Sequence, residues 1–161
     1  MKTFLTLALA LLLLLPLAAC GPKRSAEEFY SMVNAPGSEH EGTVMLGMKR
    51  NEGITAYVRD DTGGRLRYDD NDILVSDTSK THMTHPAGVT WDMSKEEIIA
   101  YYAKDPQVTL TEAPNLLTFT KTIGDTLYYA RYVLYDDGTI FQVNLTTDPT
   151  VDPMEFPRSL N

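Results

Sequence analysis

Residues 117–145 read LTFTKTIGDTLYYARYVLYDDGTIFQVNL, and this stretch decides the fold. Apolar residues alternate with polar ones on both sides of two turn signals, Gly124-Asp125 and Asp136-Asp137-Gly138. Alternation with a period of two predicts strands, and short turns rich in Gly and Asp join antiparallel neighbours. The segment from Leu127 to Leu134 is apolar on both faces, which is typical of a central strand. The stretch therefore predicts a three-stranded antiparallel meander.

A helix is expected just before this meander, in the sequence VTWDMSKEEII at residues 89–99. Ser94 and Glu97 have the spacing of a capping box, in which each side chain accepts a hydrogen bond from the backbone of the other. Met93 and Ile98 have the spacing of a hydrophobic staple. The pair Asp105-Pro106 marks the latest point at which this helix can end.

The first half of the chain has the same outline. Ser25 and Glu28 have capping-box spacing, and Phe29, Met32 and Val33 share one helical face, which predicts a second helix. Alternating residues between 43 and 76 predict another antiparallel meander, whereas residues 77–90 read as an irregular segment. The predicted fold class is α+β, with short helices packed on an antiparallel sheet in the order helix, meander, helix, meander.

Length and charge limit what the protein can be. The 161 residues fit one domain, for which we expect the bounds 25–147, followed by an extended Pro-rich tail at 148–161. Lys and Arg total 14 against 22 Asp and Glu, a net charge of −8 that argues against binding nucleic acid. The chain has a single cysteine, Cys20, so no internal disulfide can form.

The N-terminus has the form of a targeting segment. Residues 1–19, MKTFLTLALALLLLLPLAA, combine one positive charge, an apolar run and small residues, as in a signal peptide that is cleaved off. The run Leu17-Ala18-Ala19-Cys20 resembles a bacterial lipobox. The resemblance implies cleavage before Cys20 and acylation of its thiol, with residues 20–24 as a short lipidated tether. The alternatives are an ordinary secretory signal with an incidental cysteine, or an uncleaved anchor.

The lipobox sets the expected location. Two or three acyl chains hold a protein at a bilayer stably, so the partner predicted for Cys20 is the membrane of a bacterial cell envelope. Removing residues 1–19 also removes Lys2, which changes the side-chain charge to 13 − 22 = −9. Gly21 follows the cysteine, and the absence of Asp there favours the outer membrane, facing the periplasm, over the inner membrane.

Candidate chemical sites are few. His82 and His85 form His-x-x-His and are the weak candidates for a metal site, although the spacing suits neither a helix face nor a strand face. The acidic run Asp69-Asp70-Asn71-Asp72 fails the calcium-loop pattern, because position 5 of such a loop would be Ile73. No nucleophile motif and no phosphate loop occurs, so no cofactor and no catalytic residue are predicted.

Tyrosines offer the best candidate for a binding surface. Four of them fall in one strand region, and Tyr128 and Tyr132 lie on the same face of the predicted central strand. Tyrosine supplies rigid, amphipathic contact area at interfaces. The alternative is that these rings are half-buried on the sheet, as strand-forming residues often are.

The segment Trp91-Asp92-Met93-Ser94-Lys95-Glu96-Glu97-Ile98, followed by a meander, resembles small envelope lipoproteins of the BamE (SmpA/OmlA) and β-lactamase-inhibitor-like group. The resemblance covers residues 90–145 and implies a non-catalytic role in contacting proteins. We therefore expect a lipid-anchored module that binds an envelope protein in assembly, as a scaffold or as an inhibitor. The alternatives are a ligand- or metal-binding lipoprotein that uses His82 and His85, and an envelope hydrolase.

Overall fold

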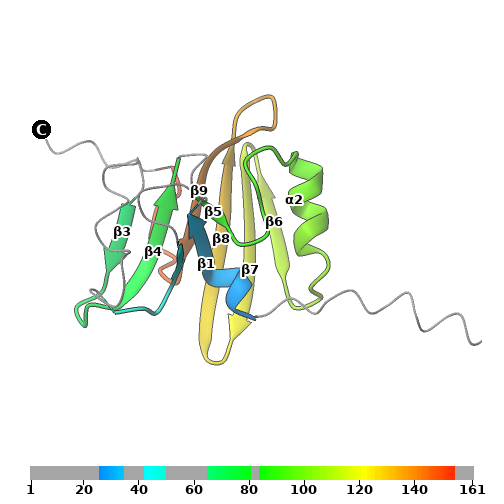
Figure 1. Cartoon of the computed structure of the whole chain (residues 1–161). Helices are drawn as coiled ribbons and strands as arrows, with labels where there is room; N and C mark the ends of the chain where they lie inside the picture. Colours follow the sequence, from blue (N-terminus) through cyan, green and yellow to red (C-terminus); the bar gives the residue numbers. More distant parts are fainter. Residues whose placement is uncertain (1–25, 35–41, 50–64, 81–83, 155–161) are drawn as a thin grey trace, which may run out of the picture.

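A computed structural model of the chain describes residues 26–34, 42–49, 65–80 and 84–154. In these ranges the chain forms two antiparallel β-sheets, one α-helix and one 3₁₀ helix. Figure 1 shows the larger sheet with the 3₁₀ helix and β1 in front of it and the α-helix beside β6.

The larger sheet has six strands in the order β3-β4-β9-β8-β7-β6. The predicted meander forms its centre, with β8 between β7 and β9, so the prediction of a central strand is confirmed. Every pairing in the sheet is antiparallel. The strands are β3 (Arg65–Tyr68), β4 (Leu74–Ser79), β6 (Thr109–Ala113), β7 (Leu116–Ile123), β8 (Thr126–Leu134) and β9 (Ile140–Thr146).

The smaller sheet has three strands in the order β2-β1-β5, namely β1 (Ser31–Asn34), β2 (Gly42–Met45) and β5 (Thr84–Pro86). The 3₁₀ helix η1 (Ala26–Tyr30) leads directly into β1.

The α-helix α2 (Lys95–Tyr102) begins as its sequence predicts. The Ser94 side chain accepts from the Glu97 amide, and the Glu97 carboxylate accepts from the Ser94 amide, which completes the capping box. The helix ends at Tyr102, with Ala103 as C-cap, before the Asp105-Pro106 pair.

The predicted fold class is wrong: the protein is β-rich, with two antiparallel sheets, and lacks the helix-meander-helix-meander order in the described residues. The error lies in the first predicted helix. Its start forms η1, and the Ser31 hydroxyl donates to the Glu27 carbonyl, but Ser31–Asn34 then enters a sheet. β1 pairs with strands on both sides, and these ladders outweigh the weak helix preference of a four-residue segment.

Two further strands were not predicted. β5 lies in the stretch expected to be irregular, and its Pro86 is tolerated because β5 is an edge strand of the smaller sheet. β6 lies at the edge of the larger sheet and is mostly exposed, so its sequence lacks the alternation of apolar residues that indicates a strand. Of the meander predicted between residues 43 and 76, the part at 50–64 lies outside the described residues.

The larger sheet has two different faces. Its inner face carries Phe119, Ala130, Tyr132, Val143 and Leu145, all buried. These residues belong to one apolar core with residues of the smaller sheet, of η1 and of α2: Phe29, Met32, Val44, Ile98 and Tyr102. The side chains of β8 and β9 that alternate with the inner set form the outer face, which includes Arg131, Gln142 and Asn144.

Candidate functional site

The structure places Tyr132 inside the core. Its exposed fraction is 0%, and its hydroxyl lies 2.8 Å from that of Tyr102. The Phe119 ring packs edge-on to Tyr132 and stacks on Tyr102, with centroids 5.9 and 4.0 Å apart. Tyr132 is therefore not available to a partner, in contrast to the predicted binding surface.

Tyr128 lies nearer to the surface. Its half-buried ring stacks on Tyr30, with centroids 4.9 Å apart and an interplanar angle of 23°. Burial and the negative charge of Glu27 raise the pKa of Tyr30, so its hydroxyl stays protonated at neutral pH. The pair thus places two stacked aromatic rings beside the start of β8.

The candidate metal ligands do not form a site in the described residues. His82 lies outside them. His85 is half-buried in β5, and its Nδ1 lies 3.0 Å from the Pro86 carbonyl oxygen. Within the described ranges no group of three His, Cys, Asp or Glu is placed to hold a metal ion.

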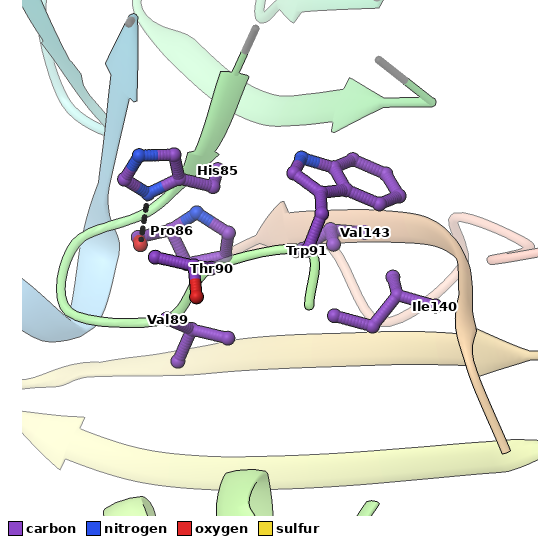
Figure 2. Close-up of a pocket in the computed structure, with 7 residues that line it drawn as sticks. All are labelled: His85, Pro86, Val89, Thr90, Trp91, Ile140 and Val143. Carbon is purple, nitrogen blue, oxygen red and sulfur yellow. Dashed lines mark hydrogen bonds between the residues drawn. The ribbon is translucent and has the colours of Figure 1, made fainter. Parts of the chain in front are cut away.

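A shallow hollow opens beside His85 (Figure 2). Apolar side chains dominate its lining, and it encloses no space for a water molecule. One of the lining residues, Trp91, is buried and donates from Nε1 to the Thr84 carbonyl at 2.7 Å, which fixes the loop that follows β5. We interpret the hollow as a packing feature of this loop.

The acidic turns use their carboxylates locally. Asp69 Oδ1 accepts from the amides of Asn71 and Ile73 at 2.9 and 2.8 Å. Asp137 Oδ1 accepts from the amide and the hydroxyl of Thr139 at 2.9 and 2.6 Å. Such bonds hold a turn in shape, and they lower the pKa of Asp137.

The outer face of the larger sheet carries a buried polar layer that was not predicted from the sequence. Asn144 is 1% exposed and donates from Nδ2 to the hydroxyls of Ser76 and Thr78 at 3.0 and 2.9 Å. Gln142 is also 1% exposed and donates to the Pro153 carbonyl. Neither side-chain oxygen of these two amides has a hydrogen-bond partner among the residues that the structure describes. The only sequence signal was that two amides occupy alternate positions of one predicted strand.

Residues 147–154 lie against this polar layer, and we call them the C-terminal strap. They belong in part to the predicted tail 148–161, of which 155–161 lies outside the described residues. Arg131 donates from Nη1 to the Val151 carbonyl at 2.6 Å and from Nη2 to the Pro149 carbonyl at 3.4 Å. Asp148 also lies 3.7 Å from Arg67 of β3. Burial lowers the pKa of Arg131, which nevertheless stays charged.

An exposed aromatic group lies at the hairpin between β8 and β9. Tyr135 is 53% exposed, and its ring packs edge-on against Phe141 with centroids 5.1 Å apart. The Lys80 ammonium lies 4.3 Å from the centre of the Phe141 ring. We call Lys80, Tyr135 and Phe141 the hairpin cluster. Aromatic residues are enriched in the contacts between proteins, and a cation over a ring is attracted to the face of that ring.

Comparisons with known proteins give no relative: no family model, no curated protein and no solved structure matches this chain. Among the described ranges, neither helix has the length and apolar character that crossing a membrane requires.

Proposed function

We propose that the protein is a lipid-anchored component of a bacterial cell envelope that binds another envelope protein and has no catalytic role. The observation that carries the proposal is the run Leu17-Ala18-Ala19-Cys20 directly after an apolar leader. The thiol of Cys20 would carry the lipid. The favoured location is the periplasmic face of the outer membrane.

The hairpin cluster supports the binding role and replaces Tyr132 as the candidate contact. Only three large apolar side chains of the described residues are exposed, namely Leu127, Tyr135 and Met154. Of these, only Tyr135 belongs to an aromatic group with a cation beside it. Such a group offers area that can be desolvated on contact with a partner.

Metabolic labelling with palmitate tests the anchor. The native protein should incorporate label and partition into detergent, whereas Cys20→Ser should do neither. The matched control is Asp70→Cys, which introduces a second thiol at an exposed turn far from the leader in sequence and should not add label. A native protein that stays unlabelled, or that retains residues 1–19 by mass spectrometry, contradicts the proposal.

The binding role needs a test of its own. A photo-crosslinking amino acid at Tyr135 should give a discrete adduct with an envelope protein in living cells. The same amino acid at Glu112, an exposed position of β6, serves as the control. Equal adducts from both positions would argue against the hairpin cluster as the contact.

A further inference from the structure

The structure brings the start of the described chain to one end of the large sheet. η1 packs on β8, and its last residue, Tyr30, stacks on Tyr128 near the beginning of that strand. The hairpin turn between β7 and β8, which contains Gly124 and Asp125, lies at this same end (Figure 1). The hairpin cluster lies at the opposite end of β8, after Leu134.

The covalent distance from Cys20 to this end is short. Six residue steps separate Cys20 from Ala26, and an extended chain of that length spans at most about 20 Å. β8 contains nine residues, which corresponds to a length of about 30 Å. An anchor at Cys20 therefore stays within about 20 Å of the start of η1, a distance shorter than β8.

The side chains at the near end suit the surface of a bilayer. Leu127 is 42% exposed at the start of β8, and the Tyr30–Tyr128 pair lies at the same end, on the other face of the sheet. Tyrosine is favoured at the level of lipid headgroups because its ring is apolar and its hydroxyl is polar. Glu27 and Asp125 are exposed at the same end, and their charges oppose approach to anionic lipids.

We propose that the β7–β8 end faces the bilayer, with Leu127 and the Tyr30–Tyr128 pair against neutral headgroups, and that the hairpin cluster points away from the membrane. This inference rests on the proposed lipid anchor. It gives the protein a fixed orientation at the membrane, in which the lipid-facing end and the protein-binding end lie at opposite ends of β8.

Fluorescence quenching by lipid headgroups tests the orientation. Asp125→Cys and Asp136→Cys each replace one exposed aspartate in a hairpin turn, so the two variants are matched in charge. Each full-length lipidated protein is labelled at the new thiol, because an acylated Cys20 does not react, and is placed in phosphatidylcholine vesicles that carry a headgroup quencher. We expect roughly twofold stronger quenching at position 125 than at position 136, since the label lies closer to the bilayer.

Two outcomes overturn the orientation: equal quenching at both positions, or stronger quenching at position 136. The mass of the purified protein separates this failure from that of the proposed function, because a missing acyl group shows that the anchor itself is wrong. Adding Leu127→Ser to Asp125→Cys should reduce the quenching, whereas adding Met154→Ser, another exposed apolar side chain, should leave it unchanged. Thermal unfolding of each variant confirms that it is folded.

Discussion

The two faces of the six-stranded sheet are held in different ways. The inner face is apolar and aromatic, and it packs against the smaller sheet and α2. The outer face carries Arg131, Gln142 and Asn144, and their side chains donate hydrogen bonds to hydroxyls of β4 or to carbonyls of the C-terminal strap. Apolar burial supplies most of a domain's stability, whereas hydrogen bonds exchanged with water contribute little net free energy but fix geometry. We therefore expect the inner face to determine whether the protein folds and the outer face to determine how its strap is held.

The largest effect is expected from Phe119→Ala on the inner face. Phe119 is 1% exposed and touches the rings of both Tyr102 and Tyr132, so its removal leaves a cavity. The free energy of unfolding should fall by about 3–5 kcal/mol, measured by urea denaturation. Leu127→Ala, at an exposed position of the same sheet, should change it by less than about 0.5 kcal/mol. Similar losses of unfolding free energy for both variants would contradict the expectation that burial at the inner face supplies most of the stability.

Arg131→Met tests the outer face and keeps much of the side chain's length. The variant loses the donors to the Val151 and Pro149 carbonyls, and bonds from a charged donor contribute about 1.5–3 kcal/mol. A nonspecific protease should then cut within residues 148–154 faster than in the native protein, while the six-stranded sheet stays resistant. Arg131→Lys keeps the charge but loses the planar fork, so its cleavage rate should lie between the two. Unchanged cleavage in Arg131→Met would show that the strap does not depend on this residue.

These two variants also mark the limit of what the sequence could predict. The alternation of Leu117, Phe119 and their neighbours is a local signal, and it correctly predicted the strands around β8. Alternation along the strand puts Arg131 on the face opposite Tyr132, but nothing local indicates that residues 149–151 supply its acceptors. That arrangement comes from chain segments about 20 residues apart that meet only in the folded protein.

The first predicted helix failed for a related reason. Phe29 and Met32 are both buried, so the pattern correctly identified core residues. A span of nine residues is too short for periodicity to separate a helix from a turn followed by a strand, and β2 and β5 decide the outcome. In the same way, tyrosine is a residue type typical of interfaces, but Tyr132 faces the core. Side chains of one strand alternate between the two faces of the sheet, and both faces of β8 are covered.

Ser94→Ala should have a smaller effect, on the helix that covers part of the inner face. The variant removes the acceptor of the Glu97 amide and breaks the capping box. Loss of an N-cap costs about 1 kcal/mol, so the midpoint of urea denaturation should fall with little change in slope. Ser94→Asp retains an acceptor at the N-cap and should stay close to the native value. A loss of unfolding free energy as large as that of Phe119→Ala would show that the stability of the sheet depends on the N-terminus of α2 as much as on the aromatic core.

The smallest expected effect is the pH-dependent contribution of Asp148, in the C-terminal strap, to the free energy of unfolding. The Thr150 hydroxyl and amide lower the pKa of Asp148, with help from Arg67 and Arg131. A carboxyl whose pKa is lower in the folded state stabilises that state above its unfolded pKa of about 3.9, and this contribution is lost as pH falls through the folded value.

Asp148→Asn should therefore lower the free energy of unfolding at pH 7 by less than about 1 kcal/mol, because the side chain is partly exposed. The difference from the native protein should begin to shrink below the unfolded pKa of about 3.9 and should vanish once the pH has fallen through the lower folded pKa, where the native carboxyl is also neutral. Thr150→Ala removes the hydroxyl donor while keeping the carboxyl, so it should reproduce most of this pH dependence. A difference that stays constant down to pH 2 would show that Asp148 acts through its shape and not its charge. In that case the outer face would depend on hydrogen bonding alone, and the ion pair with Arg67 would contribute nothing measurable.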